Sequence, residues 1–155
     1  MGYEMELEEI KQEHVAASPA PNAITFTLPT CPPSVNSIWI INYREADPSR
    51  RVRIRDHCRD WKTYGKAYIP AFTISDSSIV RVDRTFYYGW FAKNGNWRKR
   101  DTGNMDKLLF DMISEKTGID DRRFKLGMMD SVNSPTERTV VTLTEVLIVE
   151  WSKRV

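Results

Sequence analysis

The segment from residue 97 to residue 124 places carboxylates inside runs of basic side chains. Asp101 directly follows three basic residues, and the pair Asp120 and Asp121 is directly followed by two arginines. Carboxylate oxygens bind Mg²⁺ through one or two direct ligands and leave other coordination positions for water and phosphate. Lysine and arginine beside them neutralise the rest of a phosphate backbone. The pattern therefore predicts a metal-dependent phosphodiesterase that acts on nucleic acid.

The basic residues near these acids have two explanations. Lys107 falls on the first turn of a predicted helix, where a positive charge opposes the helix dipole. Contact with the scissile phosphate or the leaving oxygen would explain it, and a solvated polar face is the alternative. The flanking basic residues are expected to hold DNA phosphates without reading sequence. They are Arg98, Lys99, Arg100, Arg122 and Arg123.

The acids have structural explanations as well. A carboxylate at position 101 would be stabilised by the helix dipole, by about 0.3–1 kcal/mol. Asp120 and Asp121 suit a turn, because aspartate favours turns. These explanations account for single acids. They do not account for carboxylates that stand beside runs of basic residues at two places in one segment.

The distance along the chain constrains the site. A helix over residues 105–116 would be about 18 Å long, and four extended residues recover at most about 13–14 Å. Asp101 and Asp121 therefore begin at opposite ends of the helix. Three alternatives are open: the following loop folds back along the helix, the helix is shorter, or a second subunit completes the site.

Apolar periodicity predicts a single small α+β domain with a mixed β-sheet flanked by two α-helices. Asn94-Gly95 is expected to form a turn. Asn104 is expected to cap the second helix and Gly118 to end it. An acidic, proline-containing flexible tail over 1–22 precedes the domain over 23–155, and an exposed loop is expected over 44–56. The expected strands span 23–28, 36–43 (alternatively an aromatic loop), 80–91, 125–132 and 139–151, and the helices 57–68 and 105–116.

Composition excludes several classes of protein. The formal net charge is +2, but residues 1–14 carry −4, so the remainder carries +6, a footprint of nucleic-acid contact. Two cysteines without metal-ligand spacing exclude a recognisable zinc site. No glycine-rich phosphate loop, membrane-spanning run or secretory signal is present, so we expect a cytoplasmic protein without a nucleotide cofactor.

The aromatic residues are expected to lie mostly in the core. The alternate spacing of Phe86, Tyr88 and Trp90 places them on one face of a strand. Trp39 and Trp97 stand beside polar or basic residues and would be able to stack on bases, although the core explanation is favoured for them too.

Three blocks resemble the RusA-type Holliday junction resolvases. They are LPTCPPSVNSIW (28–39), RDTGNMDKLLFDMI (100–113) and IDDRRF (119–124), in the family's order, and the resemblance covers roughly residues 23–148. It implies an intertwined homodimer that binds four-way DNA junctions and nicks them symmetrically with Mg²⁺ or Mn²⁺, in a bacterial or phage-infected cell. By position, Asp101 and Asp121 would be metal ligands, Lys107 the lysine needed for cleavage and Asn104 the motif asparagine.

The chain departs from the family pattern at Gly103, where better-known members have an aspartate. One alternative is that the position is dispensable and that Asp101, Asp121 and a neighbour hold the metal. Another is that Asp106 or Asp120 supplies the carboxylate, with Asp106 favoured because it shares the first turn of the helix. The third alternative is a protein that binds junctions without cutting them. A different Mg²⁺-dependent nuclease, acting on flaps or forks, is a further rival.

Overall fold

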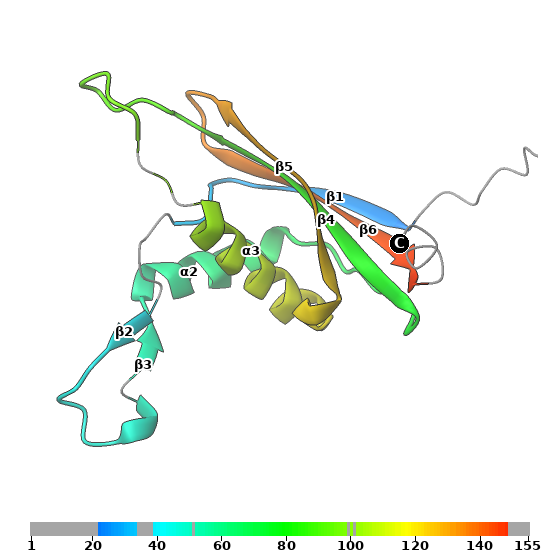
Figure 1. Cartoon of the computed structure of the whole chain (residues 1–155), viewed down its shortest axis with the longest axis horizontal. Coiled ribbons are helices and arrows are strands. Elements are labelled where there is room, and N and C mark those ends of the chain that lie inside the picture. Colours follow the sequence, from blue (N-terminus) through cyan, green and yellow to red (C-terminus); the bar gives the residue numbers. More distant parts are fainter. Residues whose placement is uncertain (1–21, 34–38, 51, 99, 101, 149–155) are drawn as a thin grey trace, which may run out of the picture.

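A computed structural model describes residues 22–33, 39–50, 52–98, 100 and 102–148. It is one α+β domain in which a four-stranded mixed sheet packs against two helices (Figure 1). The elements are β1 (Ala23–Leu28), β2 (Trp39–Ile41), η1 (Pro48–Arg50), β3 (Val52–Ile54), α2 (Asp56–Gly65), η2 (Lys66–Tyr68), β4 (Ser78–Tyr88), α3 (Thr102–Thr117), η3 (Asp121–Arg123), β5 (Phe124–Asn133) and β6 (Arg138–Leu147).

The sheet has the order β1-β6-β4-β5. Strand β6 pairs antiparallel with both β1 and β4, whereas β4 pairs parallel with β5. Parallel neighbours require a crossover connection, and α3 supplies it. This arrangement confirms the predicted α+β class, the mixed sheet and the two helices.

The core lies between one face of the sheet and the two helices. Alternate residues of β4 are buried, among them Val80, Val82 and Phe86, as the period of two in a strand requires. Helix α3 contributes the apolar stripe that its sequence predicts, and every member is fully buried. The stripe consists of Met105, Leu108, Leu109, Met112 and Ile113.

Two turns follow the sequence predictions. Gly95 has a φ of 81° in the turn at Asn94-Gly95, and Gly118 has a φ of 73° just after α3. Glycine adopts this left-handed region without the steric cost that a Cβ brings. The predicted turn and the predicted end of the second helix are therefore confirmed.

Two expectations about local structure are wrong. The segment 44–56 is not only a loop, because Val52–Ile54 forms a strand paired with β2; its apolar alternation is hidden among arginines. Helix α3 begins at Thr102, so Asn104 lies inside it and does not cap it.

Gly65 explains the orientation of α2. A Cβ at this position would lie 2.5 Å from the Sδ of Met112 on α3. The two helices therefore approach each other through a residue without a side chain, and Tyr64, the preceding residue of α2, is exposed. Within the described ranges, no helix is both long enough and apolar enough to cross a membrane.

Glu145 on β6 ties the segment before β4 to the sheet. One of its oxygens accepts hydrogen bonds from the Ser75 backbone N–H (2.8 Å) and the Ser78 hydroxyl (2.7 Å). The other accepts from the Asn22 side-chain amide (2.9 Å). Asn22, which we assigned to the tail, thus contacts the domain; the tail itself lies outside the described residues, and its boundary stays a prediction.

These hydrogen bonds predict acid sensitivity. The Ser75 N–H, followed by the side chains of Asn22 and Ser78, lowers the pKa of Glu145 to about 2, below the value of about 4.3 for an unfolded chain. The contribution of Glu145 to the free energy of unfolding is therefore complete above the unfolded pKa and is lost as the pH falls through about 2. In urea unfolding at a series of pH values, Glu145→Gln should be less stable than wild type at neutral pH. The difference should shrink in acid, and a difference independent of pH would contradict this assignment.

Candidate functional site

Helix α3 carries a row of charged residues on the side that faces α2. Lys107, Asp111 and Glu115 are spaced four residues apart, so they lie on one face of the helix. Lys62 of α2 binds one oxygen of Glu115 (2.6 Å), and Lys66 of η2 binds the other (2.5 Å). These contacts fasten the C-terminal half of α3 to α2 and η2.

Asp111 is half-buried in the middle of this row. Burial raises the pKa of its carboxyl, and the charges of Asp121 and Glu115 raise it further, whereas Lys62 and Lys107 lower it. Asp111 has no hydrogen-bond or ion-pair partner among the residues that the structure describes. A half-buried carboxylate near a second acid and two lysines is an arrangement found at sites that handle cations and phosphates.

Asp121 enters this environment because Arg123 anchors its 3-10 turn. The Arg123 guanidinium donates to the carbonyl oxygens of Ser75 (2.5 Å) and Ser78 (2.7 and 3.0 Å). These are the residues that Glu145 also holds. Arg123, which was expected to contact DNA, is therefore half-buried in the structure and positions η3 at the beginning of β5.

Asp106 forms an ion pair with a buried arginine of the sheet. The Arg84 Nη2 lies 2.6 Å from one Asp106 oxygen, and its Nε lies 2.9 Å from the other. The side chains of Arg84 and Asp106 are only 4% and 19% exposed. The guanidinium also lies 5.6 Å from the ring centroid of Phe110 on α3. Asp106 was favoured to replace the motif aspartate. Both of its carboxylate oxygens bind Arg84 and thus attach α3 to the sheet.

Asp120 caps the 3-10 turn. It accepts hydrogen bonds from the backbone N–H of Arg122 (2.9 Å) and from its guanidinium (2.6–3.0 Å). The Arg122 side chain first, then its backbone N–H, lowers the pKa of Asp120 to about 2. Both residues are exposed, so this ion pair is open to exchange with an incoming phosphate or cation.

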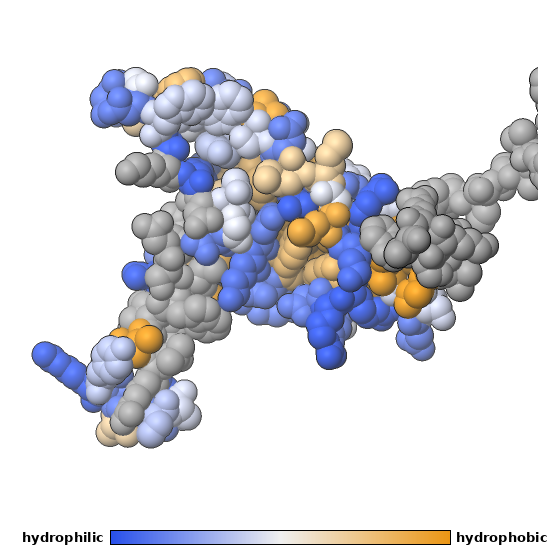
Figure 2. Space-filling model, viewed as in Figure 1, coloured by the Kyte–Doolittle hydropathy of each residue, from blue (hydrophilic) through white to orange (hydrophobic). Residues whose placement is uncertain are grey.

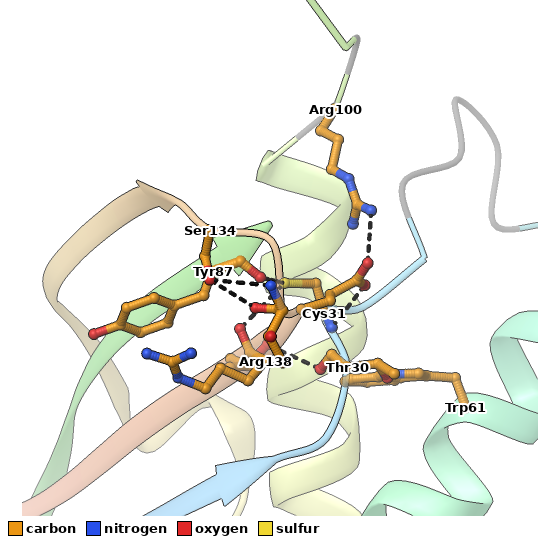
Figure 3. A network of polar contacts seen from close by, with 10 residues as sticks. Thr30, Cys31, Trp61, Tyr87, Arg100, Ser134 and Arg138 are labelled. Atoms are coloured by element: carbon orange, nitrogen blue, oxygen red, sulfur yellow. Dashed lines mark hydrogen bonds and ion pairs between the residues drawn. The ribbon is translucent and has the colours of Figure 1, made fainter. Parts of the chain in front are cut away.

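Arg100 lies in a polar network that joins the beginning of α3 to the sheet (Figure 3). Its Nη2 lies 3.1 Å from Glu137, and its guanidinium lies 4.7 Å from the ring centroid of Tyr88. The other oxygen of Glu137 accepts from the Cys31 N–H (2.9 Å). The Cys31 thiol, whose pKa is raised by burial, donates toward the carbonyls of Tyr87 and Arg138. Arg100, the residue before Asp101, is thus bound within the domain.

The remaining predicted residues are placed as follows. The Arg98 side chain is exposed, and its backbone N–H donates to the Trp90 carbonyl (2.6 Å). Asn104 is half-buried on the first turn of α3. Asp101 and Lys99 lie outside the described residues.

The length of α3 excludes one of the alternatives for the site. Its 16 residues span about 24 Å, so the helix is longer than expected, and the shorter-helix alternative is wrong. The charge of Asp121 acts on Asp111, halfway along α3, whereas Asp101 lies outside the described residues. A loop that folds back along the helix and completion by a second subunit therefore stay open as alternatives.

The described ranges contain no group of three or more histidine, cysteine or acidic side chains able to hold a metal ion. The donors that the structure does bring near each other, Asp111 and Asp121, are the hard oxygen ligands that Mg²⁺ takes one or two at a time. Sequence reasoning missed Asp111. The signal was its position four residues after Lys107, on the same helical face.

The chain matches no family model and no curated protein. The resemblance to RusA-type resolvases therefore stays a prediction that rests on the motifs.

The ion pair between Arg84 and Asp106 predicts a loss of stability that does not depend on metal. Asp106→Asn leaves a buried guanidinium without its carboxylate, which costs about 3–5 kcal/mol in comparable pairs. We expect a drop of about 3 kcal/mol in the free energy of unfolding, measured in urea with a chelator present.

Asp111→Asn is the matched control, one turn further along the same helix. Because burial raises the pKa of Asp111, neutralising it should leave the stability unchanged or slightly higher. Equal stability of Asp106→Asn and wild type would show that the pair does not attach α3.

Proposed function

We propose that this protein is a Mg²⁺-dependent endonuclease that cuts branched DNA, four-way junctions in particular, by paired symmetric nicks. The observation that carries the proposal is the shared electrostatic environment of Asp121, Asp111 and Lys107. Two acids and a lysine, supplied by η3 and one face of α3, are what a phosphodiester cleavage site requires. The motifs around Asp101 and Asp121 supply the substrate class.

The residues present fit a divalent cation. Asp111 is half-buried without a partner in the described part of the chain, and Asp121 lies within reach of its charge. Bound Mg²⁺ would activate a water for attack on the phosphodiester and shield the charge that develops there. Asp121 and Asp111 would hold the cation together with Asp101. Lys107 would stabilise the charge on the phosphate or the leaving oxygen.

A homodimer would bring the distant acid into the site. In this proposal Asp101 of the partner subunit joins Asp121 and Asp111, since about 24 Å of helix separates the two ends within one chain. Strand β5 lies at the edge of the sheet and exposes Leu126 (69%) and Met128 (74%). Figure 2 shows apolar side chains on this face along the course of β5. An exposed apolar edge strand supports pairing with a second copy.

A protein that binds junctions without cutting them is the second candidate. Gly103 lies on the first turn of α3 and offers no side-chain ligand. The two acids expected to replace it are already engaged, Asp106 with Arg84 and Asp120 with Arg122. Nicking of a synthetic four-way junction, assayed with and without Mg²⁺, separates the two candidates, and comparison with flap and fork substrates tests the related nucleases.

Replacing Asp101 or Asp121 should abolish cleavage of a four-way junction but leave binding of the junction intact. We expect Asp101→Asn and Asp121→Asn to nick a four-way junction at least about 100-fold more slowly than wild type, because each loses a direct metal ligand. Gel-shift affinity in chelator should be unchanged. Asp60→Asn, which neutralises an exposed acid of α2, is the control. Normal nicking by Asp101→Asn would refute the metal assignment.

Mixing the two inactive variants tests whether each site spans two subunits. After subunit exchange, half of the dimers contain one chain of each kind, and each mixed dimer has one intact site. About one quarter of the wild-type nicking rate should return, as single nicks. Sites built within one chain would give no activity in the mixture, which would rule out the shared site.

A further inference from the structure

The connection from β4 to α3 forms a hairpin that projects beyond the sheet (Figure 1). The Arg98 N–H donates to the Trp90 carbonyl (2.6 Å), and the Ala92 N–H donates to the Asn96 carbonyl (2.8 Å). A bridge between Phe91 and Trp97 completes the pairing. We call residues 90–98 the aromatic hairpin. Its backbone pairing gives its side chains defined positions.

The aromatic hairpin holds large rings in water. Trp97 is 67% exposed and Phe91 is 44% exposed, so the core explanation favoured for Trp97 is wrong. Their ring centroids lie 4.4 Å apart, and Trp97 lies 6.0 Å from Trp90. Exposed aromatic rings do not gain the free energy that burial of their large apolar surface would give. An ordered cluster of them on a projecting hairpin indicates a partner with flat apolar faces.

An open cavity of about 260 Å³ lies where the aromatic hairpin meets the ends of β4 and β5. Two hydrogen bonds join these parts: the Trp90 N–H to the Asn133 side chain (3.0 Å) and the Ser134 N–H to the Tyr88 carbonyl (3.0 Å). The lining consists of Tyr88, Trp90, Trp97, Arg98 and Ser131. The volume is below the roughly 300–1,000 Å³ of sites for drug-sized ligands, so it suits one ring system.

The polar groups of this cavity favour an anionic polymer. Arg98 is its charged lining residue, Lys93 is exposed on the same hairpin, and none of the described lining residues is acidic. The charge of the described lining is therefore positive, as binding of a polyanion requires.

We propose that the cavity of the aromatic hairpin binds one unpaired base of single-stranded DNA. The base would stack on Trp97, and Arg98 would contact a neighbouring phosphate. Aromatic stacking accepts any base, and it needs a base face that a duplex hides. Proline-rich peptides also use aromatic grooves, but the cationic lining favours the polyanion. The inference rests on the proposed function for the choice of DNA as the polymer.

The test measures binding of a short fluorescein-labelled oligothymidylate to the full-length protein by anisotropy, in chelator, so that cleavage plays no part. Trp97→Ala should weaken binding by about 5- to 150-fold, the loss of one stacked base. Trp97→Phe should retain most of the affinity. Tyr64→Ala, which removes an exposed ring from α2, should bind like wild type.

Arg98 is tested through salt dependence. Arg98→Ala should lower the slope of log affinity against log salt by about 0.7, the value for one phosphate of a single strand, and Arg98→Lys should keep the slope. Wild-type affinity in Trp97→Ala, an equal loss for a blunt duplex, or displacement of the oligonucleotide by a proline-rich peptide would each overturn the inference.

The outcomes separate this inference from the proposed nuclease. If Asp101→Asn nicks junctions normally but Trp97→Ala loses oligonucleotide affinity, the nuclease site is wrong and the base-binding cavity stands. If Asp101→Asn is inactive and Trp97→Ala binds normally, the reverse holds.

Discussion

The ion pair between Arg84 and Asp106 is the contact on which the positions of the candidate residues depend. A guanidinium that is almost fully buried needs a carboxylate partner, because an unpaired buried charge is costly. In the described part of the chain its ion-pair partner is Asp106, on the first turns of α3. Pairing fixes the rotation and the height of the helix over β4. Lys107 and Asp111 are on the same helix, so their placement follows from this pair.

Basic residues near the candidate site divide into internal and external groups. Arg84, Arg100 and Arg123 bind acids or carbonyl oxygens within the domain and set the positions of α3 and η3. Arg98 and Arg122 are exposed. A run of basic residues in a sequence thus overstates the charge available to a nucleic acid. The fold uses part of it to hold acids at defined places, and the surface retains the rest.

Local patterns in the sequence predicted the architecture well. The period of two in β4 and the apolar stripe of α3 are properties of short segments, as are the turns at Gly95 and Gly118. Pairings between distant residues were not predictable in this way. Arg84 is 22 residues from Asp106, and Arg123 is 45 from Ser78. Their partners depend on sheet order, which no local pattern encodes. Asp111 was missed because it lies among the apolar residues of the stripe, and Trp97 was misjudged because its exposure depends on where the hairpin projects.

The pairing of β1 with β6 has a consequence for how the protein is made. Ala23 lies opposite Thr144 and Leu28 opposite Thr139, so β1 leaves the ribosome more than 100 residues before its partner β6. Until then its backbone groups have no ladder partner in this sheet, and contacts of such long sequence separation form slowly. The sheet can therefore be completed only after β6 has been synthesised. In the nascent chain, the apolar strand β1 is therefore accessible to chaperones and able to pair incorrectly until β6 is available.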